Sequence, residues 1–208
     1  MANPKNFPQD QYEKPFINLP YQKIYLYLLL VGLTFLFIAF AIGYVYTRSA
    51  NEVADGVYLP PIFIANSILL LLSSLTIKWA NEAYKQDETK KYQNALNLTF
   101  LLTAIFLIMQ VLAWTLYKDA LMGENIGNGK QYLYALSGLH FAHVFGGLPF
   151  LLYFMYVASV RMKEPVSVLV YFSDPSKKLH LELLTVYWHF LDALWIFLVL
   201  FFLLNMLF

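Results

Sequence analysis

Five long apolar runs are the feature that most constrains how this chain can fold. A helix needs about 20 residues to cross a hydrocarbon core of about 30 Å, and every run reaches that length. The runs cover residues 24–46, 58–79, 95–117, 132–160 and 181–208. None shows the alternation of apolar and polar residues that a membrane β-barrel requires. The runs predict an all-α, polytopic membrane protein, with residues 21–208 forming a bundle of five transmembrane helices.

The fourth run is longer than a straight span needs. We expect it to be tilted, bent near Pro149, or extended past the membrane. Residues 1–20, ahead of the first run, are polar and carry four prolines. They lack the short apolar region and the cleavage site of a signal peptide. We therefore expect a retained, largely irregular tail on the membrane surface.

The basic residues predict the orientation. Eleven of the fourteen Lys and Arg residues lie in the tail, the second loop and the fourth loop, and the remaining loops hold only Arg48, Lys118 and Lys130. The excess of positive charge marks the cytoplasmic side. We expect a cytoplasmic N-terminus and, in a bacterium, a periplasmic C-terminus.

Composition excludes several classes of protein. The formal net charge of +1 lacks the basic excess of a nucleic-acid binder. The chain has no cysteine. This excludes disulfides, thiolate zinc sites, iron–sulfur clusters and covalently attached haem of the Cys-x-x-Cys-His type.

The last run carries polar residues at helical spacing, namely Glu182, Thr185, His189 and Asp192. An Asp at the centre of a spanning helix costs about 2.5–3.5 kcal/mol on insertion scales, so this stripe should face protein. A proton relay and hydrogen bonding between helices both fit the pattern. We favour hydrogen bonding, with no catalytic role for these residues.

The fourth run carries small residues at every fourth position, Gly138, Ala142 and Gly146. Such spacing lets another helix approach closely. We expect the last helix to pack there, with His143 and Gly147 beside the contact.

Histidines offer the one candidate metal site. His140 and His143 are three residues apart and share roughly one helix face. Together with His189 they could provide three nitrogen ligands. We favour hydrogen bonds to neighbouring helices, as is usual for polar groups inside membranes. The sequence then predicts no metal or cofactor in this chain, and a structural polar seam of His140, His143, Glu182, His189 and Asp192.

Two motifs resemble subunit III of the haem–copper respiratory oxidases. The last run matches that family's final helix, with its hallmark Tyr-Trp-His-Phe-x-Asp-x-x-Trp, at Tyr187, Trp188, His189, Phe190, Asp192 and Trp195. The fourth run is similar to the preceding helix of the family at Gly138, His140, His143, Val144 and Gly147. The resemblance covers about residues 20–208. It implies the shorter, five-helix bacterial form.

One departure from the family pattern concerns the first shared helix. Family members often carry a carboxylate midway along it, and residues 27–46 contain no acidic residue. The proton-antenna role assigned to that carboxylate cannot be transferred to this chain.

The resemblance implies a non-catalytic core subunit of an aerobic respiratory chain oxidase. Such a complex reduces oxygen to water with electrons from cytochrome c or quinol and pumps protons. Haem and copper would belong to partner subunits. This chain would contact subunit I directly, join subunit II in a complex in the bacterial inner membrane, and could enter a larger supercomplex. It would bind phospholipids, with Arg161 the leading candidate for a head-group contact because guanidinium matches phosphate bidentately.

Two alternatives keep part of this interpretation. The chain could be a subunit III-like accessory protein of a nitric oxide reductase. It could also be a small ion transporter that uses the His/Asp stripe. The transporter is less favoured, because the sequence lacks paired broken helices.

Overall fold

The computed structural model describes residues 20–50, 59–117, 129–162 and 164–207. These residues form six helices and no strand: α1 Tyr21–Ala50, α2 Pro61–Lys85, α3 Thr89–Leu116, α5 Gly129–Arg161, α6 Pro165–Ser173 and α7 Pro175–Leu207. The expected N-terminal tail lies outside the described residues, apart from Pro20. Five of the helices are long and apolar enough to cross a membrane. The all-α, multi-pass membrane architecture predicted from the sequence is confirmed.

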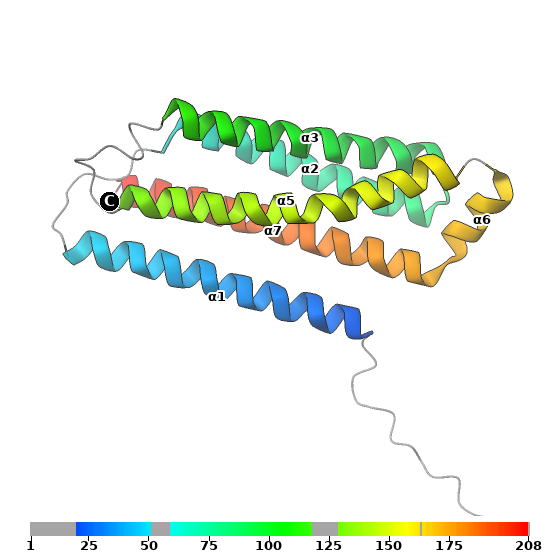
Figure 1. Cartoon of the computed structure of the whole chain (residues 1–208), viewed down its shortest axis with the longest axis horizontal. Helices are drawn as coiled ribbons and strands as arrows, with labels where there is room; N and C mark the ends of the chain where they lie inside the picture. The colour runs from blue at the N-terminus through cyan, green and yellow to red at the C-terminus, as the bar shows by residue number, and fades with distance from the viewer. Residues whose placement is uncertain (1–19, 51–58, 118–128, 163, 208) are drawn as a thin grey trace, which may run out of the picture.

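The long helices run alternately up and down one bundle (Figure 1). Each extends past its apolar run at one end or at both, because polar residues can continue a helix outside the hydrocarbon. The last helix begins at Pro175 rather than near Leu181, and the second ends at Lys85. Proline suits the first turn of a helix, where its missing N–H would have no partner. Pro61, Pro165 and Pro175 accordingly open three of the helices.

Helix α5 passes through Pro149 without ending. Its 33 residues make it about 50 Å long, which exceeds a hydrocarbon core of about 30 Å. The helix is therefore longer than a straight span needs, and the tilt, the bend near Pro149 or the extension past the membrane expected from the fourth run stays a prediction.

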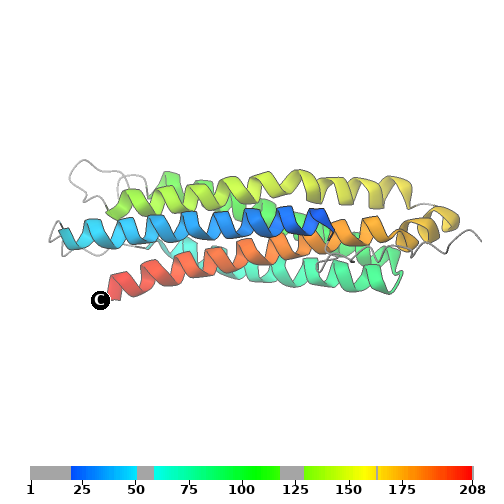
Figure 2. The same ribbon diagram turned by 90° about the horizontal axis from the view of Figure 1, so that it is seen from below.

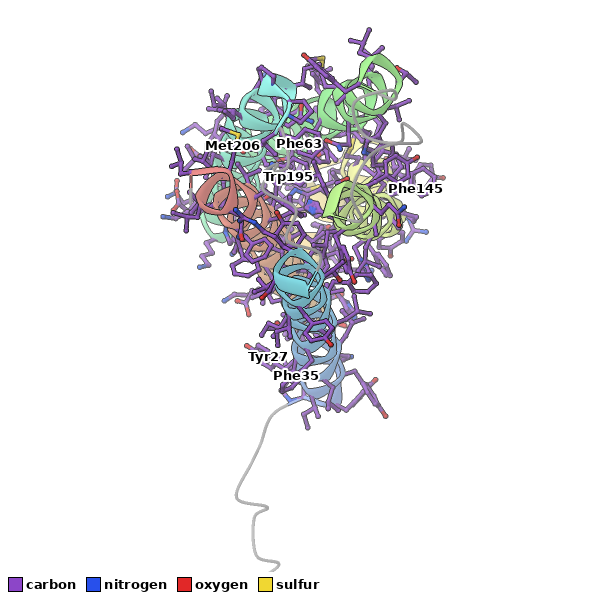
Figure 3. All side chains as sticks on the ribbon, turned by 90° about the vertical axis from the view of Figure 1, so that its left-hand side faces the viewer. Tyr27, Phe35, Phe63, Phe145, Trp195 and Met206 are labelled. Atoms are coloured by element: carbon purple, nitrogen blue, oxygen red, sulfur yellow. The ribbon has the colours of Figure 1, made fainter. Side chains whose placement is uncertain are left out.

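Helix α1 is attached on one side of the bundle, where it lies between α5 and α7 (Figure 2). Leu33, Phe37 and Tyr44 are buried against them. The opposite side of α1 is apolar and exposed, and Tyr27 and Phe35 point away from the bundle (Figure 3). In the membrane this side faces lipid or another subunit.

Helix α6 was not predicted from the sequence. It crosses the end of the bundle between α5 and α7 (Figure 1). The Tyr84 hydroxyl donates to the Tyr171 carbonyl oxygen at 2.9 Å, and the Tyr92 and Tyr171 hydroxyls lie 3.3 Å apart. The Phe172 ring packs edge-on against both α2–α3 tyrosines. Burial raises the pKa of the Tyr171 phenol, which is already well above physiological pH. A nine-residue helix has too few turns to show a clear period in the sequence.

Replacing Tyr84 by Phe tests this attachment. The variant keeps the ring but loses the hydroxyl donor, and one hydrogen bond contributes about 1 kcal/mol. We expect amide hydrogen exchange in α6 to become roughly fivefold faster, measured by mass spectrometry on the purified chain. The control is Tyr25→Phe, on the exposed side of α1. Equal exchange rates in α6 for both variants would contradict the attachment.

Candidate functional site

Helix α2 presents a row of small polar side chains to its neighbours. Its buried residues recur every three to four positions and include Asn66, Ser67, Ser73 and Thr76, and Ser74 is half-buried beside them. This spacing places them along one broad face of the helix. We call these five residues the α2 polar face. Lipid offers no hydrogen-bond partner, so the face requires partners on other helices.

Two tryptophans of the last-helix motif bind this face. The Trp188 Nε1–H donates to Ser73 Oγ at 2.9 Å, and the Trp195 Nε1–H donates to Ser67 Oγ at 3.1 Å. Ser67 in turn donates to the carbonyl oxygen of Phe63. Both indoles are fully buried, a position in which the N–H normally needs an acceptor. The α2 serines therefore supply the hydrogen-bond acceptors that the two buried indole N–H groups require.

The motif histidine and aspartate meet the same face at Ser74. His189 Nδ1 lies 2.6 Å from Ser74 Oγ, and the Asp192 carboxyl lies close to the same serine. A hydroxyl has one hydrogen to donate and lone pairs to accept with. An Nδ1–H of His189 can thus donate to Ser74, whose own hydrogen can then point toward Asp192. Asp192 is buried, and its Oδ2 atom has no partner among the described residues.

Helix α3 binds the rest of the α2 polar face. Asn66 donates to Gln110 Oε1 at 2.9 Å, and the Thr76 and Thr99 hydroxyls lie 2.8 Å apart. Helix α2 is therefore joined to α3 on one flank and to α7 on the other. These pairs depend on which helices lie beside α2, which the sequence of a single helix does not specify.

The predicted polar seam divides into separate contacts. His140 is fully buried between the rings of Phe106 and Trp195, at centroid distances of 5.7 and 4.9 Å. Neither of its ring nitrogens has a partner in the part of the chain that the structure describes. His143 Nδ1 instead lies 2.7 Å from the Leu139 carbonyl oxygen of its own helix.

A three-histidine metal site is not formed. His189 is engaged on the α2 side, whereas His140 and His143 lie on α5. Among the described residues, no three His, Asp or Glu side chains gather closely enough to hold a metal ion. The side chains present in the described ranges do not fit a metal centre.

Glu182 lies outside the contact around Ser74. Its carboxylate is 3.9 Å from Lys23 Nζ of α1, and both side chains are partly exposed. Arg48 of α1 reaches α7 in a similar way and donates to the Asn205 carbonyl oxygen at 2.6 Å. The two contacts connect both ends of α1 to α7. The predicted polar stripe of α7 therefore contacts α1 through Glu182 and α2 through His189.

The contact between α5 and α7 centres on Gly147. A Cβ added there would lie 2.9 Å from the Tyr187 ring and 3.2 Å from the Trp188 ring. The Tyr187 hydroxyl donates to the His143 carbonyl oxygen at 2.9 Å. Phe190, the remaining motif aromatic, is half-buried and packs on the bundle core.

The predicted packing of the last helix on the small-residue stripe is wrong. A Cβ at Gly138 or at Gly146 would meet nothing within 4 Å, and Ala142 is exposed. Adjacent residues of a helix point about 100° apart, so Gly147 faces α7 while Gly146 faces away from it.

Gly147→Leu should destabilise the bundle, because the added atoms would overlap the Tyr187 and Trp188 rings. Overpacking of this kind typically costs about 1–3 kcal/mol. Gly146→Leu is the matched control, since its position is open. Both substitutions also replace a helical glycine, so the accompanying change in helix propensity cancels in the comparison. Thermal unfolding of the purified chain in detergent should show a lower midpoint for Gly147→Leu alone, and equal midpoints would contradict the packing.

Comparison with known proteins agrees with the two motifs. The family model described as cytochrome c oxidase subunit III matches residues 22–205. A protein named probable cytochrome c oxidase subunit 3, from Rickettsia felis, is 32% identical over 155 residues, which cover 70% of this chain and 52% of the relative. Cytochrome c oxidase subunit 3 of Papio hamadryas is 28% identical over 181 residues, covering 82% and 64%.

The chain thus spans about half the length of the Rickettsia relative it matches. The family match nevertheless includes all five membrane-spanning helices and both motifs. The resemblance drawn from the motifs is confirmed, and the chain belongs to the cytochrome c oxidase subunit III family.

Proposed function

We propose that this chain is a non-catalytic core subunit of an aerobic respiratory haem–copper oxidase in a bacterial inner membrane. In this role it stabilises the catalytic subunit and binds phospholipids, while the complex reduces oxygen to water and pumps protons. The observation that carries the proposal is the use of the motif side chains. Trp188, His189 and Trp195 bond to serines of α2, so they connect helices of this chain.

The proposal includes the partners and the orientation. Haem and copper belong to the other subunits, and this chain contacts subunit I directly, alongside subunit II. The distribution of Lys and Arg supports a cytoplasmic N-terminus and a periplasmic C-terminus. The long apolar surfaces of α1 and α3 are available to lipid or to subunit I.

A proton relay is the second candidate for the motif side chains, and one observation favours it. His189 and Ser74, joined by a short contact, and the neighbouring Asp192 form a polar chain that ends on a buried carboxyl, one oxygen of which has no partner among the described residues. Such a chain could move a proton as well as hold two helices together. We favour the structural role, because the neighbouring tryptophans use the same α2 face and cannot carry protons.

Purification of the tagged chain in mild detergent tests the proposed assembly. Subunits I and II should co-purify, and the complex should show haem absorbance and bound copper that the isolated chain lacks. Recovery of nitric oxide reductase subunits would assign the chain to that enzyme. Ion flux through the chain reconstituted alone would instead support a transporter.

Substitutions of Asp192 separate packing from proton transfer. Asn keeps an acceptor for Ser74, and single hydrogen bonds in membranes average about 0.6 kcal/mol, so Asp192→Asn should assemble nearly normally. Asp192→Leu removes the acceptor and should lower the yield of complex that contains this subunit. Initial oxygen consumption per haem should be near wild type in both, decaying faster where the subunit is lost. Immediate loss of turnover or pumping in intact Asp192→Asn complexes would establish a proton path.

Metal content gives an independent test. We expect the isolated chain to bind no zinc or copper stoichiometrically, because His140 is enclosed by aromatic rings and His143 is engaged with its own helix. Elemental analysis after dialysis against each metal measures this directly. A stoichiometric metal that is lost in His143→Ala would contradict the expectation.

A further inference from the structure

Three fully buried polar side chains come from three different helices of the bundle. They are Asn66 of α2, Gln110 of α3 and His140 of α5, and each has a relative exposure of 0%. We call them the interior polar cluster. Within the described part of the chain, Asn66 Oδ1, Gln110 Nε2 and both ring nitrogens of His140 have no hydrogen-bond partner. Buried polar atoms are normally paired, either with protein or with ordered water.

The contacts of α3 place the three side chains at one depth in the bundle. The Trp114 Nε1–H donates to Ser137 Oγ at 3.1 Å, which fixes the alignment of α3 with α5. The two helices run in opposite directions (Figure 1). Gln110, one turn before Trp114, therefore lies level with His140, which is about one turn after Ser137. Asn66 is at the same depth, because it donates to Gln110 Oε1 at 2.9 Å.

Aromatic rings enclose the bundle at this depth. The rings of Phe106 and Trp195 flank His140 at centroid distances of 5.7 and 4.9 Å. Phe106 lies about one turn from Gln110 on α3. Trp195 stacks on Phe63 in the bundle interior (Figure 3). These rings separate the interior polar cluster from lipid, so anything that binds there must be small.

The unpaired atoms include both donors and acceptors. The Asn66 carbonyl oxygen can only accept a hydrogen bond, and the Gln110 amide nitrogen can only donate one. A neutral imidazole, as in His140, has one N–H donor and one acceptor nitrogen. A ligand that satisfies the cluster must therefore donate as well as accept.

We propose that the interior polar cluster binds one ordered water molecule, which bridges α2, α3 and α5. The water donates to Asn66 Oδ1 and to the acceptor nitrogen of His140, and it accepts from Gln110 Nε2. A buried water typically makes about three hydrogen bonds. The remaining N–H of His140 lies among the Phe106 and Trp195 rings, whose π faces are weak acceptors.

The same atoms argue against two other occupants. A cation would meet the N–H donors of Gln110, and none of the three side chains of the cluster is a carboxylate that could balance its charge. An apolar gas molecule would leave every unpaired atom of the cluster without a partner. Water is the smallest molecule that can donate two hydrogen bonds and also accept one.

The bridge has a consequence for the packing of α5. Trp114 binds Ser137 toward one end of the α3–α5 contact, and Gln93 Nε2 donates to the Ala158 carbonyl oxygen at 2.6 Å toward the other end. The water adds a polar contact between these two and extends it to α2. This assigns His140 a role in joining three helices. The inference goes beyond the proposed function and does not depend on assembly with an oxidase.

Density for the water tests the proposal without any substitution. The full chain is purified, alone or in its complex, and its structure is determined at a resolution that shows ordered water. We expect one peak at about 2.7–3.2 Å from Asn66 Oδ1, Gln110 Nε2 and one ring nitrogen of His140. A direct hydrogen bond from His140 to either amide, or unpaired atoms with no peak among them, would overturn the proposal.

A double-mutant cycle tests the bridge by its energetic effect. His140→Phe removes both ring nitrogens but keeps an aromatic ring, and Asn66→Leu removes the amide with little change of volume. A shared water couples the two side chains, so their effects on the unfolding equilibrium constant should be non-additive by a factor of roughly five. Reversible unfolding of the full chain in mixed detergent micelles measures this factor.

His143→Phe is the matched control, because His143 bonds to the Leu139 carbonyl oxygen of its own helix. Combined with Asn66→Leu, it should act additively. Additive effects of His140→Phe and Asn66→Leu, or the same coupling for both histidines, would contradict the bridge. If a variant does not fold, the density of the unsubstituted protein decides the question.

Discussion

Hydrogen bonds from α7 to the α2 polar face are the interactions on which the rest of the bundle depends. Apolar contact alone cannot select the neighbours of a helix in a membrane, since lipid tails are as apolar as leucine. The indoles of Trp188 and Trp195 and the imidazole of His189 find acceptors or partners on α2. These bonds place the two helices in one register and bring the Phe63 and Trp195 rings into a stack at 5.4 Å.

The bonds also explain why helix α2 carries so many small hydroxyl residues. A serine or threonine can satisfy a neighbouring donor and still bond to its own helix, as Ser67 does with Phe63. Helix α2 can therefore join α3 and α7 at once without leaving polar side chains exposed to lipid. Helix α1 packs on α7 through buried apolar side chains, and Lys23 and Arg48 add polar contacts at its two ends.

The contacts give the residues of the family motif a role in packing between helices. Its aromatic and polar residues connect α7 to α2 and to α5. Gly147 of α5 leaves room for the Tyr187 and Trp188 rings. The motif histidines lie in different surroundings, because His140 is enclosed by rings, His143 is bonded within α5 and His189 meets Ser74. The three motif histidines therefore do not form one site.

The sequence by itself determined the helical class, the five spans and the family, because span length and motif spacing are local properties of the chain. It also indicated that Asp192 must face protein, since lipid cannot solvate a carboxyl. Only the tertiary structure decided that its partner is Ser74 of α2, that Gly147 rather than Gly146 meets α7, and that α6 is a helix. The physical reason is that pairing depends on the rotation and neighbours of each helix, which are set by packing across the whole bundle.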